Sequence, residues 1–286
     1  MEELHKTSIR VSDIASQYWC ERQMEYNYKY GKKMTTAALK EGRMLHEELE
    51  GEVNVPIILQ PKNYPDFMYK SLYTSYMALD ALKKNKKTRE VQIYGSIMGY
   101  KVVGKIDQLD LKDGKVAILE DKTRASDNVP SDNQRITHRI QAMAYKKLID
   151  DIMEGSYTVD NFIRAYHTGT MKLTEEFIRQ LDALAISKEL QNIDTVATRF
   201  FKDMKTFGKT SDTLYIRYIN QFTGKEIDLY KFQYSDDEMQ GIIKYVMKYW
   251  SGERKSMPVP EQEKWKCSYC VYFGKECTVW WQQKVL

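Results

Sequence analysis

The spacing of apolar side chains along the first part of the chain predicts helices. Ser12 is a capping residue for a helix that should end near Gly31. A second helix should run from about residue 36 to residue 50, where leucines recur on one face. Residues 67–82 fit a third helix, and a basic run follows it. The chain therefore begins with a helical part.

Alternation of apolar and polar residues then predicts strands. Three segments follow one another closely, EVQIYG, GYKVVGKIDQLDL and KVAILEDKT. Asp113-Gly114 is a strong turn signal between the second and the third. A second hairpin should form around Thr223-Gly224, between YIRYINQF and EIDLYKFQY. The apolar stretch that contains FIRAYH predicts one more strand.

The remaining segments predict mainly helices. A long helix should cover about 133–153, and 173–203 also has a helical pattern. Ser235 and Glu238 form a capping-box pattern at the start of a helix that should run to Trp250. The tail beyond it contains prolines and clustered cysteines, so we expect it to lack regular structure.

Helical and strand patterns of this kind predict one α/β domain. The sequence contains no internal repeat, no low-complexity tract and no glycine- and serine-rich linker. We expect a single domain over 1–286, with a helical part at 1–87 and a core with a helical insertion at 88–234. Residues 235–286 should form a C-terminal helix and a cysteine cluster.

Composition and charge limit the class of protein. The chain has 44 basic and 40 acidic residues and 42% hydrophobic residues, as in ordinary folded proteins. No apolar run approaches the ~18–20 residues of a membrane span, and the first residues do not resemble a secretion or transit signal. We therefore expect a cytoplasmic protein whose four cysteines are not structural disulfides. A strongly basic coat protein is excluded, but a local basic groove is not.

Acidic side chains stand at the ends of two predicted strands that share a hairpin. Asp107 lies near the end of one strand, and Glu120 and Lys122 end the next, with Asp121 pointing to the opposite face. Two carboxylates can hold Mg²⁺ or Mn²⁺ against a phosphodiester, and an ammonium group can orient water or stabilise negative charge. A solvated edge strand with a Glu–Lys pair would show the same triplet. The apolar runs before both carboxylates favour a buried site instead.

Three further residues are candidates for the site only in combination with the carboxylates of Asp107 and Glu120. His46 lies on the second predicted helix, where a solvated acidic face is the alternative interpretation. Gln141 and Tyr145 are one helical turn apart on the long helix after the Glu-x-Lys strand. They are placed to contact a phosphate or a base, although each alone would be ordinary helix surface.

The cysteines form a cluster of three near the end of the chain and one far upstream. Cys267, Cys270 and Cys277 lie within eleven positions, and Cys20 lies in the first predicted helix. A zinc ribbon would need two close pairs, so this arrangement fits a [4Fe–4S] cluster better. Zinc remains an alternative, and unrelated buried cysteines are the weakest interpretation.

Taken in order along the chain, these motifs resemble the PD-(D/E)XK nuclease superfamily in its RecB-like iron–sulfur branch. This branch includes the exonuclease V family and the CRISPR-associated RecB-like exonucleases. The runs YWCERQMEY and EDKTRASDNVPSDNQRITHRIQAMAYKKLIDDIMEG look more like exonuclease V. One departure is Ile106, which stands where the superfamily often has proline.

The resemblance implies a fold and a function. The fold would be a PD-(D/E)XK nuclease core, a mixed central sheet flanked by helices, with N-terminal helices and a C-terminal iron–sulfur tail. The enzyme would be a metal-dependent exonuclease that hydrolyses single-stranded DNA from a free end, the 5′ end favoured, in DNA repair or processing. Single-stranded DNA would be its partner, with a single-strand-binding protein or a helicase as a further one. We expect a monomer.

The resemblance also implies residue roles. The metal ligands would be His46, Asp107, Glu120 and the main-chain carbonyl of Asp121, with Lys122 as the catalytic lysine. Gln141 and Tyr145 would position substrate and the edge of the site, and Cys20, Cys267, Cys270 and Cys277 would hold the cluster. By their chemistry, Thr123 and Arg124 are further phosphate contacts.

Two other functions remain open on the sequence. One is a CRISPR adaptation nuclease that trims prespacers, and the other is a non-catalytic nucleic-acid-binding module with a zinc site. If the protein is an exonuclease or a CRISPR nuclease, we expect a track of basic side chains that leads to the acidic site. The track would consist of Lys122, Arg124, Arg135, Arg139 and the lysines at 83–87.

Overall fold

A computed structural model of the chain describes most of its residues. They are 1, 4–31, 41, 42, 44, 45, 48, 49, 51, 53 and 57–280. The helices in this part are α1 (Val11–Lys29), α3 (Tyr64–Asn85), α4 (Asp132–Glu154), α5 (Val159–Tyr166), α6 (Glu175–Ala183), α7 (Ile193–Lys205), α8 (Asp236–Trp250) and the 3-10 helices η2 (Thr168–Thr170), η3 (Lys188–Gln191) and η4 (Glu261–Tyr269). The strands are β1 (Ile9–Arg10), β2 (Lys87–Ile97), β3 (Tyr100–Lys112), β4 (Lys115–Arg124), β5 (Thr213–Asn220) and β6 (Glu226–Gln233).

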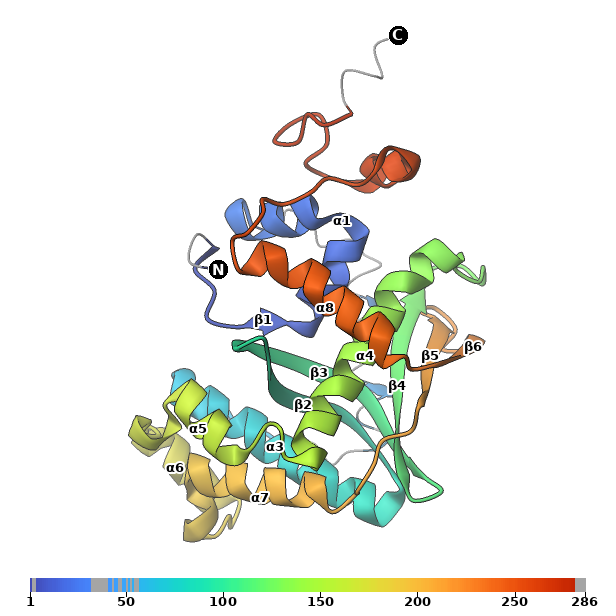
Figure 1. The fold of residues 1–286 in the computed structure, drawn as a ribbon. Helices are drawn as coiled ribbons and strands as arrows, with labels where there is room; N and C mark the ends of the chain where they lie inside the picture. Colours follow the sequence, from blue (N-terminus) through green and yellow to red (C-terminus); the bar gives the residue numbers. More distant parts are fainter. Residues whose placement is uncertain are drawn as a thin grey trace.

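These strands form one mixed sheet, as the sequence predicts. β3 pairs antiparallel with β2 and β4, β4 pairs parallel with β5, and β5 pairs antiparallel with β6. The short strand β1 joins β3 in parallel. Figure 1 shows α4 crossing the front of the sheet with α8 beside it, while α3, α5, α6 and α7 gather at its lower end. The α1 helix and the C-terminal tail lie together at the top.

The sheet opens between its two central strands. β3 and β4 are paired from their turn only as far as Gln108 and Leu119. Beyond Leu119, β4 continues to Arg124 as the partner of β5, whereas β3 pairs with β1 through Val102 and Val103. We call this opening the fork. Within the described residues no strand fills it, so its main-chain groups need other partners.

Local signals explain most element boundaries. Asp113 and Gly114 both have positive φ at the tip of the β3–β4 hairpin, which is the turn that their sequence predicts. Ser235 caps α8 by accepting a hydrogen bond from the Glu238 main-chain N–H. Gly155 ends α4 in the left-handed conformation.

Two predictions about these elements are wrong. The segment with FIRAYH is helix α5 rather than a strand, because Thr158 caps it and Phe162 and Tyr166 bury one helical face. The tail is not wholly irregular, since it contains η4. In addition, the helical pattern at 173–203 is divided into α6 and α7. Most of the second predicted helix lies outside the described residues.

No helix in the described part of the chain is long and apolar enough to cross a membrane.

Two glycines let α4 lie directly against the sheet. A Cβ atom on Gly104 of β3 would lie 2.5 Å from Tyr145 Cε1 and 2.8 Å from Val11 Cγ2. A Cβ atom on Gly95 of β2 would lie 2.5 Å from Leu148 Cδ2. The absence of these two side chains therefore sets how closely Tyr145 and its helix approach the fork.

We expect Gly104→Ala to destabilise the protein by about 1–3 kcal/mol, because the added methyl group overlaps the Tyr145 ring in a packed core. Chemical denaturation would measure the change. Gly241→Ala is the matched control, since no atom lies within 4 Å of its added Cβ and it sits in α8. That change should stabilise by about 0.5–1 kcal/mol. Equal stability of the two variants would contradict the close approach of α4.

Candidate active site

The fork brings together the acidic residues of the two strands. The Asp107 carboxylate accepts a hydrogen bond from the main-chain N–H of Asp121 at 2.8 Å, across the opening. The Asp107 side chain thus takes the place of the β3 main-chain carbonyl that would accept this N–H if the two strands stayed paired. Lys122 Nζ donates to Glu120 Oε1 at 2.6 Å, so the Glu and Lys of the triplet share one face of β4 as predicted.

Side chains of α4 form hydrogen bonds with both strands at the fork. Lys122 also donates to Gln141 Oε1 at 3.0 Å, and Gln141 Nε2 donates to the Tyr145 hydroxyl at 3.1 Å. That hydroxyl donates in turn to the Lys105 carbonyl of β3 at 2.8 Å. The structure therefore places Gln141 and Tyr145 in a chain of hydrogen bonds that bridges the fork. Their contact with substrate stays a prediction.

Burial and charge make the two carboxylates unusual. Glu120 is 1% exposed, and its Oε2 atom has no hydrogen-bond partner among the described residues. Burial and the nearby Asp107 carboxylate raise the pKa of Glu120 well above its usual range. Burial acts to lower the pKa of Lys122, but Glu120 and Asp107 raise it, so the amine stays protonated. The Lys122 ammonium group therefore lies close to both carboxylates and is paired with Glu120.

This arrangement fits a hard divalent cation. The unpartnered Glu120 Oε2, the Asp107 carboxylate and the Asp121 carbonyl are oxygen donors of the kind that Mg²⁺ and Mn²⁺ prefer. No group of three or more His, Cys, Asp or Glu side chains in the described part of the chain is arranged to hold a metal ion. His46, the remaining predicted ligand, lies outside the described residues.

The predicted phosphate contacts differ in their surroundings. Thr123 lies directly against Gly42, because a Cβ atom on Gly42 would be 2.5 Å from the Thr123 Oγ1 atom. Arg124 ends β4 on the side of Glu120 and Lys122, and its Nε atom is buried without a hydrogen-bond partner in the described part. The role of both residues as phosphate contacts stays a prediction.

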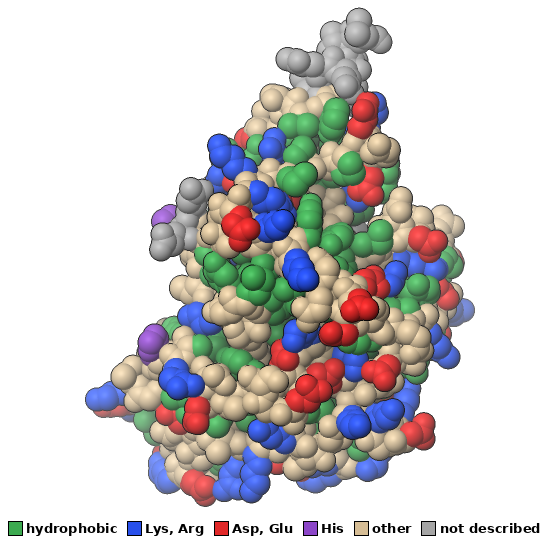
Figure 2. Space-filling model, in the orientation of Figure 1, with side chains coloured by type: hydrophobic (Ala, Val, Ile, Leu, Met, Phe, Trp, Pro, Cys, Tyr) green, Lys and Arg blue, Asp and Glu red, His purple; other side chains and the backbone are tan. Residues whose placement is uncertain are grey.

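Most of the predicted basic track is already paired. Arg135 and Arg139 of α4 form ion pairs with Asp228 and Glu238. Lys83 pairs with Asp203, and Lys84 pairs with Asp80. Figure 2 shows basic and acidic side chains interspersed on this face rather than one continuous basic stripe. Lys122 and Arg124 lie on β4, the strand that forms one side of the fork.

The sequence interpretation missed a histidine beside the site. His138 Nδ1 lies 3.0 Å from the Tyr218 hydroxyl, with Lys122 and Arg124 nearby. Burial, together with these two cations, lowers the pKa of His138 to about 3, so it is neutral. The sequence could have indicated His138 through its position, because it lies one helical turn before Gln141 on the same helix.

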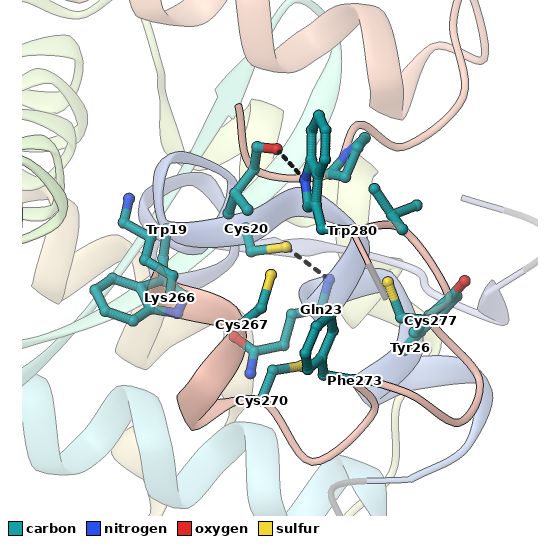
Figure 3. A pocket seen from close by; sticks show the side chains of 13 residues that line it. Trp19, Cys20, Gln23, Tyr26, Lys266, Cys267, Cys270, Phe273, Cys277 and Trp280 are labelled. Carbon is teal, nitrogen blue, oxygen red and sulfur yellow. Dashed lines mark hydrogen bonds between the residues drawn. The ribbon is translucent and has the colours of Figure 1, made fainter. Parts of the chain in front are cut away.

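The four cysteines converge on one pocket. Figure 3 shows Cys20 facing Cys267, Cys270 and Cys277, with Trp19, Tyr26, Phe273 and Trp280 around them. Cys20 interrupts the helical geometry of α1, with φ −165° and ψ 108°. Burial and the other cysteines raise the pKa of Cys267 to about 11. Four cysteine side chains around one pocket are the donor type of a thiolate-bound metal or cluster, although in the described part of the chain they are not arranged as a metal site.

A second connection ties α1 to the same region without the cysteines. The buried Glu21 carboxylate forms an ion pair with Arg254, and Trp250 Nε1 donates to Gln17 Oε1 at 2.7 Å. The main-chain N–H of Arg22 also donates to the Met257 carbonyl at 3.1 Å. The two ends of the chain are therefore held together at more than one point.

Comparison with known proteins identifies the family of this chain. A family model described as exonuclease V, a 5′ deoxyribonuclease, matches residues 2–115, 110–210 and 188–282. An exonuclease V of Danio rerio is 23% identical over 285 residues, which cover 95% of this chain and 70% of the relative. The crystal structure of SSO0001 aligns with a TM-score of 0.47 and 16% identity, over 94% of this chain and 85% of that one. Because the family model spans most of its length, this chain belongs to the exonuclease V family.

Proposed function

We propose that the protein is a metal-dependent exonuclease that hydrolyses single-stranded DNA from a free 5′ end, in DNA repair or processing. The observation that carries the proposal is the buried Glu120 carboxylate, whose unpartnered Oε2 atom lies on the same edge as Asp107 and Lys122. Burying a carboxylate with an unused oxygen costs free energy, and a bound cation relieves that cost. Membership of a family described as 5′ deoxyribonucleases supports the choice of DNA and of the 5′ end.

In this proposal His46, Asp107, Glu120 and the Asp121 carbonyl hold Mg²⁺ or Mn²⁺. When bound, the cation polarises the scissile phosphate and lowers the pKa of a neighbouring water. Asp107 is fixed for this task by the Asp121 N–H, and Glu120 is fixed by Lys122.

Lys122 acts on the reacting groups directly. Two of its three N–H bonds go to Glu120 and Gln141, and both partners hold it at the edge of β4. The third bond is directed to the attacking water or to a phosphate oxygen, where the charge stabilises the transition state. Arg124 stands two residues further along the same side, about 7 Å away, and binds a neighbouring phosphate.

The cysteine pocket holds a [4Fe–4S] cluster in this proposal. One ligand comes from α1 and three come from the tail, which suits a cluster that joins the two ends of the chain. Zinc is the alternative occupant of the same four thiolates.

Replacement of the site residues tests the catalytic assignment. Glu120→Gln and Lys122→Ala should each reduce single-turnover cleavage on the order of a thousandfold, because each removes a group that acts in the transition state. DNA binding in EDTA, measured by fluorescence anisotropy, should change little. The matched controls are Glu226→Gln and Lys115→Ala, two exposed strand positions that should cleave normally. Undiminished cleavage by both site variants would refute the assignment.

Colour and metal content test the cysteine pocket. The purified protein should be brown, with a broad visible absorption and about four irons per chain, as expected for a [4Fe–4S] cluster. Cys270→Ser should lose the colour and unfold at a lower temperature. Ser268→Ala, an exposed neighbour between two of the cysteines, should keep both properties. A colourless protein that contains zinc would favour the alternative, a zinc-bearing module.

The requirement for an end separates an exonuclease from an endonuclease. Linear single strands labelled at the 5′ or the 3′ end should be degraded with Mg²⁺ and not with EDTA, and the 5′ label should appear first in short products. Circular single strands should resist, because they offer no end to bind. Equal cleavage of linear and circular strands would contradict the exonuclease proposal.

A further inference from the structure

Behind the catalytic edge, the Asp121 side chain is held by two arginines. It points away from Glu120 and Lys122 and is 1% exposed. Arg217 donates to it through Nε at 2.8 Å and Nη2 at 2.9 Å, and Arg89 donates through Nη2 at 2.5 Å. Burial opposes ionisation, but the two guanidinium groups lower the pKa of Asp121, so the carboxylate stays charged. We call Arg89, Asp121 and Arg217 the Asp121 clamp.

The clamp crosses the sheet at the fork. Arg89 belongs to β2, Asp121 to β4 and Arg217 to β5, and Arg217 is the direct register partner of Asp121. Arg89 also donates to Gln108 Oε1 at 2.8 Å, and Gln108 is the last β3 residue paired with β4. The clamp therefore joins strands on both sides of the opening at the point where their main-chain pairing stops.

Stability alone is a poor reason for such a cluster. A buried carboxylate between two guanidinium groups loses much of the hydration of all three ions, and apolar replacements of similar clusters are often neutral or stabilising. The position of Asp121 suggests a different reason. Its N–H fixes Asp107, its carbonyl is the proposed metal ligand, and its two neighbours in the chain are Glu120 and Lys122.

Strand geometry explains why the clamp lies on the back of β4. Side chains alternate between the two faces of a strand, so Asp121 points away from Glu120 and Lys122. Arginines can therefore bind Asp121 without occupying the catalytic face. A side chain fixed at both carboxylate oxygens restricts the peptide planes on either side of its Cα atom. Beyond Leu119, β4 has main-chain pairing with β5 but none with β3, so it is less constrained on the β3 side, and the clamp adds a restraint there.

We propose that Arg89 and Arg217 are positioning residues of the nuclease site. Acting through Asp121, they hold the main chain at the fork so that Asp107, Glu120 and the Asp121 carbonyl are arranged for a divalent cation. This inference rests on the proposed function. Partners of metal ligands contribute about 10–100-fold to metal affinity or activity when they act in this way.

Arg217→Gln tests the clamp, because the Arg217 side chain is 19% exposed and its replacement leaves the fully buried Arg89 in place. Mn²⁺ binding without DNA, measured by titration calorimetry, should weaken by about 10–100-fold. Cleavage at saturating DNA should fall, and DNA affinity in EDTA should stay within about twofold of the wild type, because the clamp does not face the substrate. Arg217→Lys keeps the positive charge but cannot donate to both Asp121 oxygens as the guanidinium group does, so it should give an intermediate Mn²⁺ affinity.

Arg254→Gln is the matched control. Arg254 is also 19% exposed and also pairs with a carboxylate that is almost fully buried, Glu21, but it lies at the junction of α1 and the tail. It should lower the unfolding temperature as Arg217→Gln does and leave Mn²⁺ affinity unchanged. If Arg217→Gln and Arg217→Lys behave like this control, the clamp is only structural and the inference is wrong.

Glu120→Gln distinguishes failure of the clamp from failure of the proposed function. Loss of Mn²⁺ binding in Glu120→Gln, together with normal binding in Arg217→Gln, would overturn the clamp alone. Normal Mn²⁺ binding and cleavage in Glu120→Gln would overturn the metal site, and the clamp would fall with it.

Discussion

The end of main-chain pairing between β3 and β4 is the constraint on which the rest of the site depends. A strand that leaves its neighbour exposes N–H and C=O groups that must find other partners. At the fork the Asp107 carboxylate takes the first of these, the Asp121 N–H, and the Tyr145 hydroxyl takes the Lys105 carbonyl. The Asp107 carboxylate that accepts this N–H is also one of the oxygen donors of the proposed metal site, and Tyr145 belongs to the hydrogen-bond chain that ends at Lys122.

Both faces of β4 contribute to this edge, in different ways. The front carries Glu120 and Lys122 against α4, and the back carries Asp121 between two arginines. The close approach of α4 depends on the missing side chain of Gly104, so packing and chemistry are coupled through one residue. Glu120 and Asp121 are both buried beside opposite charge, Glu120 next to Lys122 of the same strand and Asp121 between Arg89 of β2 and Arg217 of β5.

The ends of the chain meet at the cysteine pocket through a local break in regular structure. Cys20 leaves helical geometry within α1 and joins the cysteines of the tail. Independently of the cysteines, the hydrogen bond of Trp250 with Gln17 and the ion pair of Glu21 with Arg254 hold α1 to α8 and to the segment directly after it. A loss of any bound cluster should consequently loosen the tail more than it loosens α8 from α1.

The sequence by itself determined the hairpins, most helices, the family resemblance and the grouping of Asp107, Glu120 and Lys122, because these follow from local periodicity, turn chemistry and short spacing. It did not determine that FIRAYH is helical, since a short apolar run fits a strand or a buried helix equally well. Nor did it show His138 beside the site or Arg89 and Arg217 behind Asp121. Those contacts join residues up to 96 positions apart, and only the pairing of β4 with β5 and the fork beside β3 bring them together.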